Sequence, residues 1–196
     1  MMPRSAVLGL LSAVALAALG ASLAGIESAS TGTQVAVYDP ITTSGALTSA
    51  LRVTEQLHGQ CSGGGVAGRS SYRCLTTTSR IMDPCFAAKA RGPFYCPTDP
   101  ALPHVVEITV RRPAQATGFG PVERLWAIQL TNRQVCIAVI AAIGTRGPLT
   151  CLRRSPGQLE DCRLPIENTP YWTAACQVRG PQAAPFKTYR VLKVWT

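Results

Sequence analysis

The sequence contains few histidines and few acidic residues, and its cysteines form no close pairs. Only two histidines occur among 196 residues, too few to build a histidine-rich metal or proton-relay site. No C-x-x-C pair occurs either. Zinc knuckles and thioredoxin-like sites need such pairs, because two thiolates must converge on one small centre. We therefore predict no metal, no cofactor and no catalytic set.

The N-terminus has the composition of an export signal. Arg4 is the only charged side chain before Glu27, and the run from 6 to 26 is rich in Ala, Leu and Val. This pattern is typical of a secretory signal peptide over residues 1–26, with cleavage after Ala24 or after Ser30. An uncleaved anchor is the alternative, because such a run is just long enough to span a bilayer. Either way, we expect the remainder outside the cytoplasm, secreted or at the cell envelope.

The remaining chain is basic. Without residues 1–26 it keeps 18 basic and 10 acidic residues, a net charge of +8. Outside the cell, such a protein meets anionic wall polymers, phospholipid head groups and acidic glycans. The candidate anion-binding residues are two pairs, Arg111-Arg112 and Arg153-Arg154, and scattered solvated arginines are the alternative. We expect no nucleic-acid binding, because there is no motif for it and no alternation of basic and aromatic residues.

Eight cysteines, an even number, all follow the leader. Their spacing suits structural disulfides in an exported domain, which would stabilise it mainly by restricting the unfolded chain. Eight cysteines allow 105 pairings, and the sequence does not select one. Two groups of four suggest two stapled halves: Cys61, Cys74, Cys85 and Cys96, then Cys136, Cys151, Cys162 and Cys176.

The chain divides by composition at the first cysteine. Residues 27–60 are rich in Ser, Thr and Gly and are expected to form an N-terminal extension, in which 45–58 form a short helix or a first strand. Residues 61–196 are expected to form the disulfide-rich domain. Apolar and polar residues alternate over 106–111, 126–131 and 189–195, and a shorter run spans 171–178. Period-2 alternation predicts half-buried strands.

The predicted fold class is therefore mainly β: a small disulfide-stapled sandwich or open barrel with long loops. A polar turn at Asn132-Arg133-Gln134 predicts a hairpin between the strand that begins near Trp126 and the next one, over 135–140. No long internal repeat is visible.

The glycine-rich segment 63–70 imitates two nucleotide-binding motifs. It fits G-x-G-x-x-G and nearly fits the phosphate loop, with Arg69 in place of lysine, and Asp83 lies where a ribose-binding acid would stand. Both motifs need a preceding strand and a following helix, so that amides and helix dipole meet the phosphates. Cysteines bracket this segment and no βαβ pattern surrounds it. We interpret it as a flexible loop.

Three segments resemble an uncharacterised family of small cysteine-rich exported actinobacterial proteins. They are Tyr72-Arg73-Cys74, Ile81-x-Asp83-Pro84-Cys85-Phe86 and Tyr95-Cys96-Pro97, followed by an alternating strand, a Trp-containing strand and a cysteine. The resemblance covers about residues 61–196 and implies no catalytic residues. The chain departs from the pattern at Ser62-Gly63, where an aromatic residue is usual, and at Asn132-Arg133, where Asn-Gly is usual. Asp83-Pro84 suits a turn, and Phe86 suits a core position.

The leading hypothesis is a non-enzymatic binding protein at the cell envelope, with an anionic envelope polymer or another exported protein as partner. Membrane association is expected only if the leader is uncleaved. One alternative is a hydrolase that uses His104 with Ser62, Ser70 or Ser71, although no nucleophile elbow is present.

Other candidates for chemistry are weaker. A secreted protease inhibitor would present Arg146-Gly147-Pro148 in a rigid loop. Cys61, near His58, would need to be a free thiolate to act as a nucleophile. Glu160 and Asp161 are adjacent, so their side chains should point apart and not form an acid–base pair.

Overall fold

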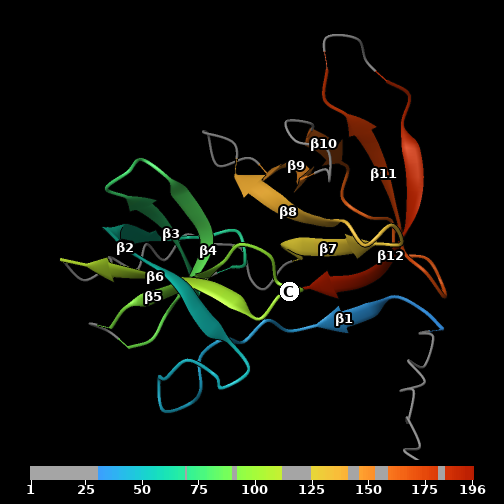
Figure 1. Ribbon diagram of the computed structural model, residues 1–196. Helices are drawn as coiled ribbons and strands as arrows, with labels where there is room; N and C mark the ends of the chain where they lie inside the picture. The colour runs from blue at the N-terminus through green and yellow to red at the C-terminus, as the bar shows by residue number, and fades with distance from the viewer. Residues whose placement is uncertain are drawn as a thin grey trace, which may run out of the picture.

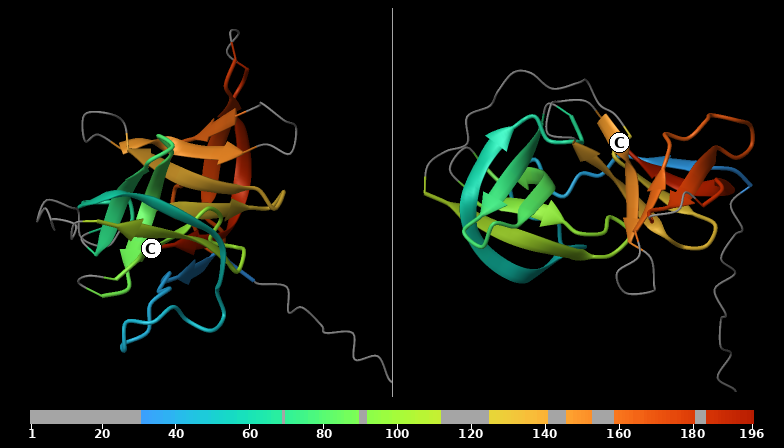
Figure 2. Two further views of the ribbon diagram at one scale, coloured as in Figure 1. Left: turned by 60° about the vertical axis from the view of Figure 1, so that its left-hand side comes forward. Right: turned by 90° about the horizontal axis from the view of Figure 1, so that it is seen from above.

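Two closed β-barrels stand side by side in the computed structural model (Figures 1 and 2). The structure describes residues 31–68, 70–89, 92–111, 125–140, 146–152, 159–180 and 184–196. At 140, 146–148 and 152 only the backbone is described. The described part of the chain contains strands and no helix. Accordingly, none of its residues belongs to a helix long and apolar enough to span a membrane. The mainly β prediction is confirmed.

The first barrel contains five strands in chain order. Neighbouring strands pair antiparallel, and the first and last strands pair parallel, which closes the barrel. The strands are β2 (Arg52–Gly63), β3 (Ser71–Thr76), β4 (Ile81–Ala87), β5 (Phe94–Pro97) and β6 (His104–Val110).

The second barrel is an antiparallel meander closed by the pairing of its first and last strands. It contains β7 (Ala127–Leu130), β8 (Val135–Ile140), β9 (Arg146–Leu152), β10 (Leu159–Cys162), β11 (Thr173–Val178) and β12 (Lys187–Trp195). A short strand, β1 (Gln34–Ala36), pairs parallel with the C-terminal part of β12. Of the two architectures left open by the sequence, the barrel is the one formed, and there are two, each closed.

The alternating segments become the strands that they predict. Ile108, Trp126, Ile128 and Leu130 are fully buried. The predicted hairpin joins β7 to β8, and Arg133 in its turn has a φ of 64°. The folded region begins earlier than the first cysteine, because β1 and the first nine residues of β2 fall within 27–60. The segment 45–58 contributes strand from Arg52 onward.

Every disulfide joins the two strands of one antiparallel hairpin. Cys61–Cys74 links β2 to β3, Cys85–Cys96 links β4 to β5, Cys136–Cys151 links β8 to β9, and Cys162–Cys176 links β10 to β11. All eight cysteines are paired. Each barrel therefore holds one of the two groups of four, and the expected two stapled halves are confirmed.

Aromatic and small apolar side chains fill the contact between the barrels. The Tyr38 ring lies 5.5 Å from the ring of Phe86, on the first barrel, and 5.5 Å from that of Trp126, which begins the second. Val66 and Ala67, in the loop after β2, are buried in the core cluster of the second barrel. The glycine-rich segment thus packs the first barrel against the second.

We expect reduction to destabilise both barrels. Each bridge closes a loop of 11 to 15 residues, so each should contribute about 3 kcal/mol by restricting the unfolded chain. Calorimetry of the protein before and after complete reduction and alkylation should show a lower midpoint, or no cooperative transition. An unchanged midpoint, with full alkylation verified by mass, would show that the bridges do not stabilise the fold.

Candidate functional site

Basic and aromatic side chains pair along the sheet formed by β10, β11 and β12. Four cations lie over aromatic rings at distances typical of cation–π contacts. They are Arg163 over Phe186 at 4.3 Å, Lys187 over Tyr189 at 5.1 Å, Arg190 over Tyr171 at 5.3 Å, and Lys193 over Trp195 at 5.1 Å. Lys187 and Tyr189 lie opposite Cys176 and Ala174, which are buried in the barrel, so this pair stands on the other side of β12. The other three pairs lie on the outer wall, and we call that surface the basic–aromatic face and define it by these six residues.

A β-bulge in β12 places two of the cations on the same side of the barrel wall. Val191 lies opposite Leu130 and Val194 lies opposite Ile128, and all four are fully buried. Two residues stand between Val191 and Val194 where an unbroken alternation allows one, so the register shifts there. As a result, Arg190 before the shift and Lys193 after it both point outward, although they are three residues apart.

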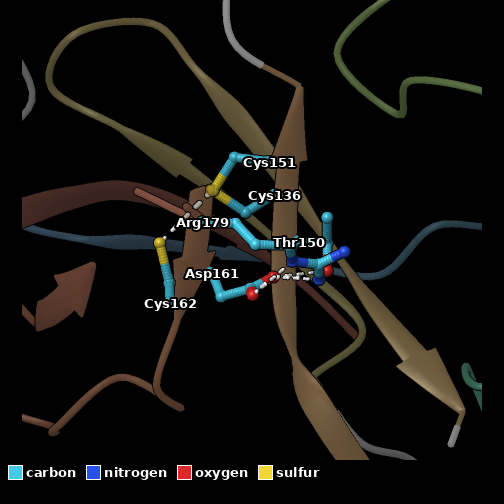
Figure 3. Close-up of polar contacts among 6 residues, drawn as sticks. All are labelled: Cys136, Thr150, Cys151, Asp161, Cys162 and Arg179. Atoms are coloured by element: carbon cyan, nitrogen blue, oxygen red, sulfur yellow. Dashed lines mark hydrogen bonds and ion pairs between the residues drawn. A yellow bond between two sulfur atoms is a disulfide. The ribbon is translucent and has the colours of Figure 1, made fainter. Parts of the chain in front are cut away.

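The basic–aromatic face keeps its positive charge. Within the described residues, no carboxylate forms an ion pair with Arg163, Arg190 or Lys193. Asp161, an acid on the outer wall beside Arg163 in the sequence, is already paired with another cation. Arg179 donates two hydrogen bonds to its carboxylate at 2.7 and 2.9 Å, and the Thr150 hydroxyl donates a third at 3.0 Å (Figure 3).

The same contacts hold the pKa of Asp161 below its usual value, mainly because Arg179 hydrogen-bonds to the charged form. Glu160, its neighbour in sequence, is 2% exposed, so the two side chains point apart as expected. They form no acid–base pair.

The arginines singled out by the sequence do not define this face. Arg111 follows β6 on the first barrel and is exposed. Arg112, Arg153 and Arg154 lie outside the described residues, so anion binding by them stays a prediction. The expectation that basic and aromatic residues do not alternate is wrong for 186–195, where Phe186, Lys187, Tyr189, Arg190, Lys193 and Trp195 alternate. The sequence of this segment alone predicted only a strand. Two of the residues that pair with it, Arg163 and Tyr171, lie in other parts of the chain.

For residues 65–68 of the glycine-rich segment, the expectation of a flexible loop is wrong. Residues 65–68 are buried, and β3 follows them where a phosphate loop needs a helix. The Val66 amide donates to Oδ1 of Asp83 at 2.8 Å. Gly65 has no room for a side chain, because a Cβ would lie 2.7 Å from Ser71 Oγ and 2.9 Å from Asp83 Oδ1. The loop therefore holds the protein's own carboxylate and not a phosphate.

Burial raises the pKa of Asp83 to about 6. The side chain is 9% exposed, and loss of hydration disfavours its charged form. The Val66 amide and the charge of Arg73, whose Nε lies 3.6 Å from Oδ2, act in the opposite direction without cancelling the effect. Asp83 is thus an acid of the first barrel that fixes the loop packed against the second.

The structure separates His104 from the serines proposed to act with it. His104 lies opposite Arg52 at the start of β2, and Ser62 lies ten residues farther along that strand, about 30 Å at the usual rise. Ser71 lies near the same end as Ser62, and its buried hydroxyl donates to the Gly68 carbonyl. Among the described residues, no hydrogen bond joins His104 to Ser62, Ser70 or Ser71. The geometry does not form a serine–histidine pair.

The structure also does not provide the geometry required by the cysteine-nucleophile and protease-inhibitor hypotheses. Cys61 is bonded to Cys74 and is not a free thiol. Arg146 begins β9, where its backbone pairs with Ile140 in the ladder between β8 and β9. The Arg146-Gly147-Pro148 segment is therefore in a strand and not in a projecting loop of the kind that an inhibitor inserts into a protease.

A depression of about 340 Å³ lies on the wall of the first barrel. Arg73 is its charged lining residue, and no histidine or carboxylate contributes to the lining. General acid–base catalysis needs a group that can exchange a proton near neutral pH. The lining residues of this depression therefore include no group suited to such proton exchange. Its lining residues are Gln60, Cys61, Ser62, Arg73, Cys74, Leu75 and Ile81.

The raised pKa of Asp83 predicts a pH-dependent stability difference between the protein and Asp83→Asn. The folded state binds the Asp83 proton more tightly than the unfolded state, so stability falls as pH rises from about 4 to 6 and stays lower above that range. Asparagine keeps an acceptor for Val66 and carries no charge. Asp83→Asn should match the protein near pH 4 and exceed it by about 3 kcal/mol at pH 7.

Denaturant unfolding at pH 4, 5, 6 and 7 measures this difference, with the exposed Asp39→Asn as the matched control. An Asp83→Asn variant that is less stable than the protein at every pH would mean that the charged pair with Arg73 is what holds the loop.

A scan against models of protein families, a search of curated proteins and a search of solved structures each found no match for this chain.

Proposed function

We propose that the protein is an exported, non-enzymatic binding protein of the cell envelope, and that its basic–aromatic face binds an anionic envelope polymer. The observation that carries the proposal is the set of three cations, Arg163, Arg190 and Lys193, held over aromatic rings on the outer wall. A guanidinium or ammonium stacked on a ring loses conformational freedom before the ligand arrives, and its N–H donors remain available at the ring edge. Such a group binds an anion with less loss of entropy.

The length of the face favours a polymer over a small anion. Arg163 lies over Phe186, just before β12, and so stands seven residues, about 20 Å at the usual rise, from Lys193. One phosphate or carboxylate cannot contact both. A chain with repeated anionic groups can contact several cations at once, and linked weak contacts add up to useful affinity.

The exposed aromatic surface suits a polymer built on sugars or polyols. Phe186 is 46% exposed beneath Arg163, and Tyr171 is half-buried beneath Arg190. Flat rings beside cations offer apolar contact and charge on the same surface. Thr173, Ala175 and Thr188, which are small residues, line up between these two pairs and leave room for a ligand to lie across the strands.

Four disulfides indicate an oxidising, extracytoplasmic environment. Export by the N-terminal signal and membership of the cysteine-rich actinobacterial family complete the proposal. Both remain predictions that come from the sequence. A basic, disulfide-bonded protein at the envelope would meet wall polymers as its most abundant anionic partners.

Neutralising the outward cations should weaken polymer binding. For Arg163→Gln/Arg190→Gln/Lys193→Gln we expect affinity for poly(glycerol phosphate) and for polygalacturonate to fall about tenfold or more, because each exposed charge contributes up to about 1 kcal/mol. Titration calorimetry at low and moderate salt measures this, and binding by the protein itself should weaken with salt. Neutral dextran serves as the uncharged comparison.

The control removes the same charge from the first barrel, as Arg52→Gln/Lys89→Gln/Arg111→Gln, and should bind nearly as well as the protein. An equal loss in both variants would mean that only net charge matters, against a defined face. Tighter binding of single-stranded oligothymidine than of either envelope polymer would assign the face to nucleic acid and overturn the proposal.

Export predicts a defined mature N-terminus. Intact mass of the protein recovered outside the cytoplasm should begin at residue 25 or residue 31, after cleavage at Ala24 or Ser30. A chain that retains Met1 and sediments with membranes would instead identify the leader as an anchor.

A further inference from the structure

The two bridges inside each barrel are in contact. In the second barrel, Sγ of Cys162 lies 3.3 Å from Sγ of Cys151 and 3.8 Å from Sγ of Cys136 (Figure 3). In the first barrel, the sulfur atoms of Cys74, Cys85 and Cys96 lie within 4.8 Å of one another. These sulfur-bearing residues are fully buried. In the second barrel a sulfur of one bridge therefore lies directly against the neighbouring bridge, and in the first barrel the two bridges lie within 4.8 Å of each other.

We propose that the four cysteines of each barrel form one thiol–disulfide exchange unit, in which a cysteine freed from one bridge attacks the other bridge and pairs with a new partner. Exchange proceeds by attack of a thiolate on a disulfide sulfur. The contact between the bridges supplies that encounter inside the folded barrel.

The exchange balances in two steps. A dithiol reductant first donates two electrons to Cys136–Cys151, becomes a disulfide itself, and leaves Cys136 and Cys151 as thiols. Cys151 then loses its proton, and its thiolate attacks Sγ of Cys162. The Cys151–Cys162 bond forms as the Cys162–Cys176 bond breaks, and Cys176 leaves as a thiolate that takes up a proton. The second step changes partners without any net oxidation or reduction.

The strand arrangement permits the new bridge without separating the sheet. Cys151 on β9 lies opposite Glu160 on β10, and Cys162 lies opposite Leu149 on β9. Cys151 and Cys162 are therefore diagonal neighbours on adjacent strands, with both side chains directed into the barrel. The exchange moves side chains within the core and keeps the ladder between β9 and β10.

The geometry also says which cysteine is not placed to start the exchange. The sulfur atoms of Cys136, Cys151 and Cys162 form a mutual contact, and that of Cys176 is not part of it. Freeing Cys151 places a thiol against a bridge, whereas freeing Cys176 does not. If the two bridges were independent, freeing Cys151 and freeing Cys176 would have the same effect on the other bridge. Removing one cysteine at a time therefore distinguishes exchange between the bridges from two independent bridges.

Cys136→Ser in the full chain leaves Cys151 unpaired beside Cys162–Cys176. We expect about one molecule in ten or more to carry Cys151–Cys162 with a free Cys176 after incubation at pH 8, which corresponds to a new bridge within about 1.4 kcal/mol of the native one. The matched control, Cys162→Ser, leaves Cys176 unpaired. It should keep Cys136–Cys151 and carry its free thiol on Cys176 alone.

Peptide mapping reads both outcomes directly. After acid quenching and alkylation in denaturant, trypsin places the four cysteines on separate peptides, 134–146, 147–153, 155–163 and 164–179, so every pairing gives a distinct mass. Cys151→Ser, which leaves Cys136 at 3.8 Å from Cys162, repeats the test if Cys136→Ser does not unfold cooperatively.

Native pairing alone in both Cys136→Ser and Cys151→Ser would overturn the proposal. Equal rearrangement in Cys162→Ser would overturn it too, because exchange would then not follow the contacts of the folded barrel.

Discussion

Hairpin disulfides are the constraint on which both barrels depend. A closed barrel of five or six short strands has a narrow interior, and a small domain buries too little apolar surface for ample stability. The core of the first barrel shows the consequence, because three of its seven buried residues are Cys74, Cys85 and Cys96, beside Met82, Phe94, Val106 and Ile108. Sulfur thus fills the centre, and it also restricts the unfolded chain, which larger apolar side chains do not.

The filled interiors leave the outer walls for function. In strands, successive side chains point to opposite sides, so each strand that delivers a cysteine inward delivers its neighbours outward. On β10, Cys162 enters the core while Asp161 meets Arg179 and Thr150 outside, as Figure 3 shows. On β12, the shift after Val191 changes this alternation and turns Lys193 outward beside Arg190. The basic–aromatic face thus depends on a local irregularity and not on composition alone.

Local pattern was enough to predict some features from the sequence, and long-range pairing explains the rest. Alternation around Ile108, Ile128 and Val191 marked strands because these residues are buried on one side. Even cysteine spacing indicated disulfides, but the pairing depends on which strands form a hairpin, because each bridge joins the two strands of one hairpin. Closure of the first barrel joins β2 to β6, which are distant in sequence. No local signal encodes that pairing.

The candidate site was harder to predict for the same reason. Its residues come from three separate segments, as when Arg190 of β12 lies over Tyr171, which precedes β11. The glycine-rich loop was misjudged because composition suggests freedom, whereas burial of Val66 and the bond to Asp83 remove it. The arginine pairs were chosen because their members are adjacent in sequence, but a positively charged surface depends on which cations are close in space.

The register of β10 against β11 links the core chemistry to the outer face. Cys162 lies opposite Cys176, and one residue farther along, the Arg163 amide donates to the Ala175 carbonyl. Ala175 in turn lies opposite Thr188, two residues beyond Phe186, so this register places Arg163 over the Phe186 ring. A slip of one residue would turn Arg163 inward and Cys162 outward. The native bridge therefore joins the two strands whose register places Arg163 on the outer face.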